Sequence, residues 1–215
     1  MNPHFEEFLE EFSPQIDIIK PSQQELAHYK DIIPAALLDF WNHAGWSGYS
    51  KGIFWSSNPA DFEPALQYWL AATGVLSNDT YTVIGRSAFG DLYLWGTRTG
   101  ASAIVHPLTS SITTKEANSE ISKGNSDAAV SAFFLSKDKE YFDFEDIKER
   151  PLFARAVKKL GPLRADEMYA FEPALSIGGV PKIENMVKVK MVEHLVLLSQ
   201  LSPIEITHLD ANRHI

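Results

Sequence analysis

The sequence predicts an α+β protein, with a mainly antiparallel central sheet and helices packed around it. Three observations indicate this class. Three short segments rich in strand-forming residues, 81–88, 91–96 and 101–106, follow one another through turns that contain glycine. The segments before them alternate between helical and extended patterns, and those after residue 126 are mostly helical. We expect both halves to form one compact body, because the sheet needs helices to cover its faces.

The predicted centre of the sheet is the hairpin around Gly90 and Asp91. Glycine takes the positive φ of a primed two-residue turn, and aspartate tolerates the next position. The strand 91–96 alternates leucine with aromatic residues, so it carries bulky side chains on both faces. We therefore expect a central strand that is covered on both sides, with structural roles for Phe89, Gly90, Asp91 and Trp95.

Several elements are expected before this hairpin. Residues 5–12 place apolar side chains at helical spacing with glutamates between them, which predicts an amphipathic helix. Ser22 and Glu25 fit a capping box for a short second helix. Pro34 and Gly45 stand where a third helix would begin and end. We then expect a glycine-rich loop, a strand and a helix, at 46–52, at 53–55 and from Pro64 onward.

The second half begins with a polar stretch. Residues 108–126 predict a linker, or one edge strand and a loop. This stretch separates two sequence domains, 1–107 and 127–215. The elements expected in the second domain are a helix over 128–135 capped by Asp127, a helix from Pro151 to residue 160, an aromatic segment at 168–171, an extended segment at 187–190, a helix over 191–201 and a last strand around Ile204 and Ile206.

Composition excludes several classes of protein. The chain has 215 residues and no cysteine, so it forms no disulfide and no thiolate site. No apolar run approaches the ~20 residues of a membrane-spanning helix, and the N-terminus does not resemble a signal peptide, so we expect a cytoplasmic protein without a membrane partner. The net charge is −9, of which residues 1–107 carry −7. Such a field repels nucleic acid and attracts a cationic protein, although a merely solvated surface is the simpler interpretation.

Candidate partner-binding residues lie in the acidic first half. Trp46 and Tyr49 are flanked by glycine and serine, and we expect them to be partly exposed and able to contact a partner. The candidate carboxylates, which would pair with basic groups, are Glu6, Glu10, Asp61 and Glu63.

The sequence shows no recognisable catalytic motif. The segment around Ser87 lacks the last glycine of a nucleophile elbow, and Asp91 stands where a P-loop would have lysine. The seven histidines lack metal-ligand spacing, so we expect neither a metal nor another cofactor. Carboxylates such as Asp143, Glu145 and Asp146 would serve acid–base chemistry only in a cleft, and a solvated loop is the simpler expectation.

Two parts of the sequence resemble known families. Residues 168–175, Gly178, Gly179 and the segment 189–201 resemble the C-terminal domain of immunity proteins that neutralise type VI secretion DNase toxins. The first half contains the motifs Ile-Pro-Ala-Ala-Leu-Leu-Asp-Phe-Trp at 33–41, Ala-Gly-Trp-Ser-Gly-Tyr at 44–49, Gly-Ile-Phe-Trp at 52–55 and the hairpin at 84–95. With these motifs it resembles the GAD-like domain, with Gly85 where that hairpin would be expected to have alanine.

These resemblances imply an immunity protein that binds a cognate nuclease toxin in the cytoplasm and covers its DNA-binding or active-site cleft. They imply no catalytic residue, no cofactor and no nucleic-acid partner. Two alternatives stay open. The chain is also similar, more distantly, to SMI1/KNR4-like proteins, which would make it an interaction scaffold. The other alternative is an enzyme whose carboxylates meet only in the folded protein.

Overall fold

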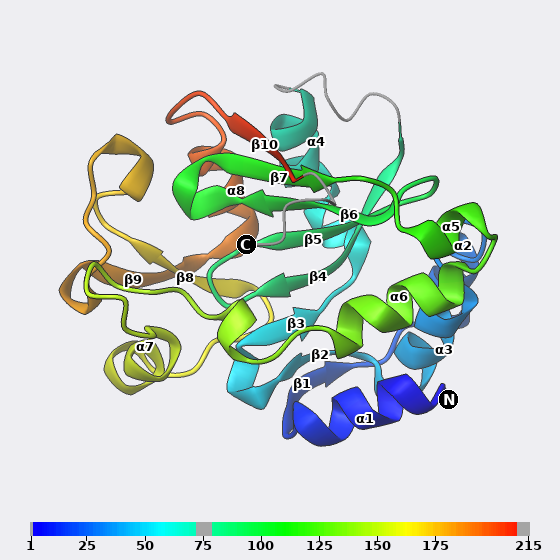
Figure 1. Ribbon diagram of the computed structural model, residues 1–215. Helices are drawn as coiled ribbons and strands as arrows, with labels where there is room; N and C mark the ends of the chain where they lie inside the picture. Colours follow the sequence, from blue (N-terminus) through cyan, green and yellow to red (C-terminus); the bar gives the residue numbers. More distant parts are fainter. Residues whose placement is uncertain (1, 72–78, 210–215) are drawn as a thin grey trace.

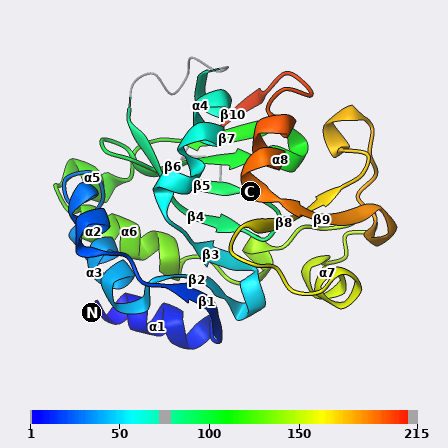
Figure 2. The same ribbon diagram turned by 180° about the vertical axis from the view of Figure 1, so that it is seen from behind.

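An eight-stranded sheet forms the centre of the protein in the computed structural model, which describes residues 2–71 and 79–209. Helices α1 and α6 lie on one face of this sheet, and α4, α8 and a two-stranded sheet lie on the other (Figures 1 and 2). The strand order is β1-β2-β3-β4-β5-β6-β7-β10, and only the β7–β10 pair is parallel. The predicted α+β class with a mainly antiparallel sheet is therefore confirmed.

The elements have the following bounds. The large sheet contains β1 (Gln15–Ile19), β2 (Trp46–Tyr49), β3 (Phe54–Ser56), β4 (Tyr81–Ser87), β5 (Leu92–Gly96), β6 (Gly100–His106), β7 (Ser111–Lys115) and β10 (Glu205–Leu209), and the small sheet contains β8 (Glu167–Phe171) and β9 (Met186–Lys190). The α-helices are α1 (Pro3–Glu11), α2 (Gln23–His28), α3 (Ala35–Ala44), α4 (Glu63–Ala71), α5 (Ser119–Ser122), α6 (Ser126–Leu135), α7 (Phe153–Leu160) and α8 (Met191–Leu198).

Aromatic rings fill the space between the sheet and the helices α1, α3 and α6. Phe5 of α1 stacks on Phe40 of α3 with ring centroids 4.5 Å apart. Phe8 packs edge-on against Phe134 of α6 at 5.1 Å. The apolar side of the N-terminal helix thus lies in the core, while its glutamates face solvent, as helical spacing predicts.

The β4–β5 connection differs from the predicted two-residue turn. Its loop contains four residues, 88–91, and only Gly90 has a positive φ, of 87°. The Ser87 side chain explains the longer loop, because its Oγ accepts hydrogen bonds from the amides of Phe89 and Asp91. The same hydroxyl donates to the Asp91 carboxylate. Phe89 and Trp95 are both buried, and their structural roles stay a prediction that substitution can test.

The expectation of a loop over residues 46–52 is wrong for its first half, which forms the strand β2 between β1 and β3. Gly48 is the reason that this strand fits. A Cβ atom at Gly48 would lie 2.8 Å from Ile16 Cγ1 and 2.9 Å from the Trp55 ring. Glycine here permits close approach of neighbouring side chains, whereas in the sequence it suggested a turn.

Two expectations for the second half also need correction. The strand at 111–115 is not an edge strand, because β7 pairs with β6 on one side and with β10 on the other. Asp127 does not cap α6, since Asn125 takes that position. The Asp127 carboxylate instead accepts a hydrogen bond of 2.9 Å from the amide of Ala36, and so holds α6 against the first turn of α3.

The two sequence domains share one body, as expected. Strand β10 of the second domain extends the sheet of the first. The Trp69 indole on α4 donates to the carbonyl of Leu195 on α8, at 3.1 Å. The amide of Tyr169 on β8 donates to the carbonyl of Ala88, at 2.9 Å. The last residues of the second predicted domain, 210–215, lie outside the described part of the chain.

Replacing Gly85 with alanine is expected to destabilise the protein by about 1–3 kcal/mol, as overpacking of a core does. A Cβ atom at this position would lie 2.5 Å from Phe54 Cζ and 3.1 Å from the Trp55 carbonyl oxygen. Urea unfolding measures the change. The same substitution in a Phe54→Leu background should cost less, because leucine lacks the ring atoms that clash. An unchanged midpoint for Gly85→Ala would show that the position tolerates alanine.

Candidate functional site

A cavity of about 640 Å³ lies where the two sequence domains meet. One wall comes from the first domain, through β1, β2, β3 and the 3-10 turn Pro59–Phe62. The other wall comes from residues 165–166 and 190–193, at the start of β8 and the junction of β9 with α8. We call this the seam cavity. Its lining includes the first residues of α8, a helix on the sheet face that is seen in Figure 2.

The seam cavity is strongly acidic. Lys190 forms an ion pair with Asp166, so one of the carboxylates already has a cationic partner. The others leave an excess of negative charge around the hollow, which favours a cationic ligand. The charged residues that line the cavity are Asp17, Glu25, Asp61, Asp166, Glu193 and Lys190.

Two of these carboxylates are close enough to influence each other. Glu25 is held by the predicted capping box, in which the amide and hydroxyl of Ser22 both donate to Oε2 at 2.7 Å. These hydrogen bonds lower the pKa of Glu25. Asp61 is exposed as a residue, but partial shielding of its carboxyl from water raises its pKa, and the negative charge of Glu25 raises it further. Asp61 thus carries its charge in an unfavourable environment.

The inner wall of the cavity combines aromatic rings with polar atoms. Trp46, Trp55 and Ser56 are buried residues that line it. Ser56 Oγ and Trp46 Nε1 are shielded from solvent and have no hydrogen-bond partner among the described residues. Unpaired buried polar atoms are uncommon in folded proteins.

Behind this wall, Arg86 connects the two sequence domains. Its guanidinium lies 4.5 Å from the Trp55 ring centroid and donates a hydrogen bond of 2.8 Å to the carbonyl of Ala165. The side chain is fully buried, and burial lowers its pKa to about 9, while the negative charge of Asp166 opposes the shift. Arg86 therefore fixes the position of the segment that forms the far wall of the cavity.

The expectation that Trp46 and Tyr49 are exposed is wrong. Trp46 is 4% exposed and Tyr49 is 0% exposed, because β2 is an inner strand. The Tyr49 ring packs edge-on against Phe8 at 5.1 Å, within the aromatic core. Trp46 borders the seam cavity from inside its wall, but Tyr49 does not line the cavity. Tyr49 is thus a core residue that cannot touch a partner.

The structure does not bring the four predicted carboxylates together. Asp61 lines the seam cavity, and Glu63 is exposed at the start of α4, two residues further on. Glu6 and Glu10 are exposed on α1, on the other face of the sheet (Figures 1 and 2). Asp17, Asp166 and Glu193 belong to no sequence motif, so the sequence did not indicate them as site residues. Glu25 was predicted only as part of a helix cap.

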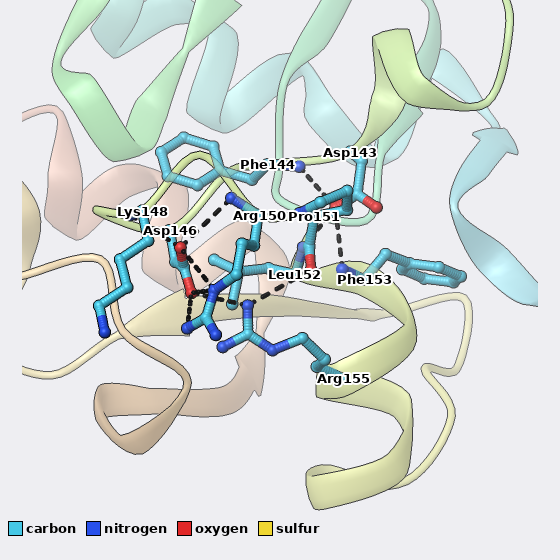
Figure 3. A network of polar contacts seen from close by, with 9 residues as sticks. All are labelled: Asp143, Phe144, Asp146, Lys148, Arg150, Pro151, Leu152, Phe153 and Arg155. Atoms are coloured by element: carbon cyan, nitrogen blue, oxygen red, sulfur yellow. Dashed lines mark hydrogen bonds and ion pairs between the residues drawn. The ribbon is translucent and has the colours of Figure 1, made fainter.

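Asp146 forms the densest ionic network of the second domain (Figure 3). Its buried carboxylate accepts hydrogen bonds of 2.7 Å from both Arg150 and Arg155, so the expected solvated loop is wrong at this residue. Nearby, Asp143 accepts hydrogen bonds from the backbone amides of Leu152 and Phe153, at the start of α7. The two aspartates fix the loop that leads into this helix, and their polar partners lie within the protein itself.

The Asp146 network predicts a specific loss of stability in acid. Hydrogen bonds from Arg150, and then Arg155, hold the pKa of Asp146 well below its usual range. The ionised carboxylate therefore stabilises the fold above the ordinary aspartate pKa of about 3.9, and this contribution is lost as the pH falls below it. Asp146→Asn should lower the melting temperature near neutral pH and flatten its decline in acid. Glu145→Gln, an exposed neighbour with the same charge change, is the control. Identical acid profiles for both variants would contradict this role.

A third polar cluster joins a carboxylate, an imidazole and a hydroxyl in the same order as the catalytic triads of hydrolases. His106 Nδ1 lies 2.9 Å from Asp91 Oδ1, and His106 Nε2 lies 3.1 Å from Thr113 Oγ1. Unlike a working triad, none of these residues lines the seam cavity or the smaller hollow beside Asp146 and Lys148. The cluster joins the β4–β5 loop to β6 and β7. Within residues 2–71 and 79–209, no three histidines, aspartates or glutamates are placed to share a metal ion.

Comparison with known proteins identifies the class. Residues 3–109 match the GAD-like domain, and residues 127–202 match the C-terminal domain of the T6SS immunity protein Tdi1. The chain thus carries a GAD-like domain followed by the C-terminal domain of a type VI secretion immunity protein. The second match supports a role as an immunity protein, whose partner is a toxin.

A solved structure shares the whole fold. It is described as the crystal structure of Atu4351 from Agrobacterium tumefaciens, and its TM-score to this protein is 0.84. The two sequences are 26% identical, and the match covers 97% of this chain and 93% of that one. A search of curated proteins finds no match. No helix in the described part of the chain is long and apolar enough to cross a membrane.

Proposed function

We propose that this protein binds a cognate type VI secretion DNase effector in the cytoplasm and neutralises it. The match of residues 127–202 to an immunity domain carries the proposal. An immunity protein needs only to bind its toxin and block it, so it requires no catalytic residue of its own. This agrees with a sequence in which no catalytic motif is recognisable.

The charge of the protein suggests how it blocks a nuclease. A DNase must present lysine and arginine to the phosphates of its substrate. The net charge of −9, with −7 before residue 108, would attract that basic surface. The carboxylates Glu6, Glu10, Asp61 and Glu63 are all exposed. Asp61 and Glu63, on the side of the seam cavity, would occupy the place of DNA phosphates in the DNA-binding or active-site cleft, whereas Glu6 and Glu10 on the other face would add to the long-range attraction.

Apolar contacts must add to these charges. Exposed ion pairs contribute only about 0–1 kcal/mol each, and tight complexes depend on a few buried apolar anchors. With Trp46 and Tyr49 buried, the exposed isoleucines Ile18 and Ile19 on the edge strand β1 are better candidates. Ile19 helps to line the acidic seam cavity, and Ile18 precedes it on the same strand. The β1 edge and the cavity mouth therefore form the most suitable contact surface for a basic protein.

Co-expression tests the proposal. Cells that produce the cognate DNase effector should lose chromosomal DNA and die, and cells that also produce this protein should keep intact DNA and grow. The two proteins should co-purify. Survival without complex formation would exclude direct neutralisation. Protection against an effector that leaves DNA intact would keep the immunity role but exclude the DNase as target.

A further inference from the structure

We propose that the seam cavity binds an arginine side chain presented by the partner protein. The inference rests on the proposed function, because it takes that partner to be the effector. It adds the chemical group that the partner would insert and the residues that would receive it. Binding of an arginine would use both sequence domains, since each contributes one acidic wall of the cavity.

The charge balance of the cavity favours a cation. Among the residues that line it, Asp17, Asp61 and Glu193 form no ion pair with any other described residue. Partial burial, and then the negative charge of the neighbouring Glu25, raise the pKa of Asp61, so a cation bound in the cavity would stabilise its charged form. A guanidinium suits several carboxylates around one hollow, because it carries five N–H donors in a planar fork.

Two buried polar atoms provide an independent indication of a ligand. Ser56 is 1% exposed and lines the cavity, and its hydroxyl, which is shielded from solvent in the free protein, could accept a hydrogen bond from a guanidinium after rotating toward the cavity. The unpaired Trp46 Nε1 could donate to a backbone carbonyl of the segment that carries the arginine. Unpaired groups such as these are normally satisfied by a partner or by water. Both residues line this one cavity.

Size and surroundings fit a side chain together with part of its backbone. The volume of about 640 Å³ is within the range of about 300–1,000 Å³ that is usual for ligand pockets. Trp46, Trp55 and Phe62 supply aromatic walls, against which a planar guanidinium packs well. Ile19 is exposed beside the hollow and would contact apolar parts of the same segment.

A short peptide tests the site without the effector. The probe is acetyl-Gly-Arg-Gly-amide, and its control contains citrulline, which has nearly the same shape but no charge. In two-dimensional NMR of the labelled protein, the arginine peptide should shift the indole N–H signals of Trp46 and Trp55 in a saturable way. The citrulline peptide should leave them in place. Equal shifts with both peptides, or none with either, would overturn the assignment.

Two substitutions should change the peptide affinity in opposite directions. Asp61→Asn should weaken binding about fivefold, the loss of one charge pair. Lys190→Gln should strengthen it, because it releases Asp166 from its internal ion pair. The matched controls, Asp31→Asn and Lys30→Gln, change the same charges at exposed positions outside the cavity and should have little effect. Changes of equal size in variants and controls would show that the peptide responds only to the overall charge of the protein. That result would contradict a specific site in the cavity.

The effector then separates the two proposals. If the effector is neutralised but the peptide does not bind, the cavity assignment is wrong and the proposed function stands. If the peptide binds but the effector is not neutralised, the proposed function is wrong and the site belongs to another arginine-bearing partner. If Asp61→Asn weakens both interactions and Asp31→Asn weakens neither, both proposals are supported.

Discussion

Replacing Phe89 with alanine is expected to destabilise the protein by about 3–5 kcal/mol, the cost of removing a buried phenyl ring. The ring is 1% exposed and lies in the β4–β5 loop of the first sequence domain. It packs against Phe144 at 5.7 Å and against Tyr169 at 6.1 Å, both of which belong to the second domain. A ring at the junction of the two domains should therefore support their association. Because single domains have only about 5–15 kcal/mol of stability, much of the protein should be unfolded or misassembled.

Urea unfolding measures this effect, and Phe89→Leu provides the control. Leucine keeps most of the apolar volume, so the loss of stability should be much smaller. Toxin neutralisation should decline only in parallel with the folded fraction. If Phe89→Ala abolished neutralisation while the melting behaviour stayed unchanged, Phe89 would be a contact residue and its structural assignment would be wrong.

The second large effect is expected on the rate at which the protein captures its toxin. Raising the salt concentration from about 0.05 M to 0.5 M should slow association by about tenfold or more, because salt screens the attraction between the acidic surface and a basic nuclease. Dissociation should change much less, because it depends on the close contacts made after capture. Surface plasmon resonance or stopped-flow fluorescence measures both rates.

Charge variants identify the surface that attracts the toxin. Neutralising Glu6 and Glu10 together should slow association at low salt, since both glutamates are exposed in the acidic half. A matched change of two exposed glutamates in the second half, Glu149→Gln with Glu172→Gln, should have a smaller effect. Association that is indifferent to salt would contradict the acidic-surface mechanism. If only the changes beyond residue 126 weakened protection, the C-terminal domain would carry the inhibition.

Local sequence patterns predicted much of the fold. The capping box at Ser22 and Glu25, and the glycine at 45 that ends α3, are signals within one or two helical turns, and both are confirmed. The parallel pairing of β10 with β7 joins residues more than 90 positions apart and has no local signal. Strand β2 was missed because Gly48, which the packing of Ile16 and Trp55 requires, has the same local appearance as a turn glycine.

The site was less predictable than the fold. Asp61 was selected from charge alone, and it does line the seam cavity. Asp166 and Glu193 line the same cavity only because β8, β9 and α8 pack on the sheet of the first domain. Residue spacing in the sequence does not predict this tertiary packing. Trp46 and Tyr49 show the opposite error, because small polar neighbours suggested exposure whereas an inner strand buries both side chains.

Neutralisation by binding is tested most directly by adding this protein stepwise to the purified effector and measuring DNA cleavage. Cleavage should fall in proportion to the amount added and stop at a one-to-one molar ratio, because inhibition is by stoichiometric binding. The inhibition should persist when DNA is added after the complex has formed. Cleavage that continues at a large molar excess would contradict neutralisation by binding. Complete inhibition by a trace amount would show that the protein acts on the effector as an enzyme.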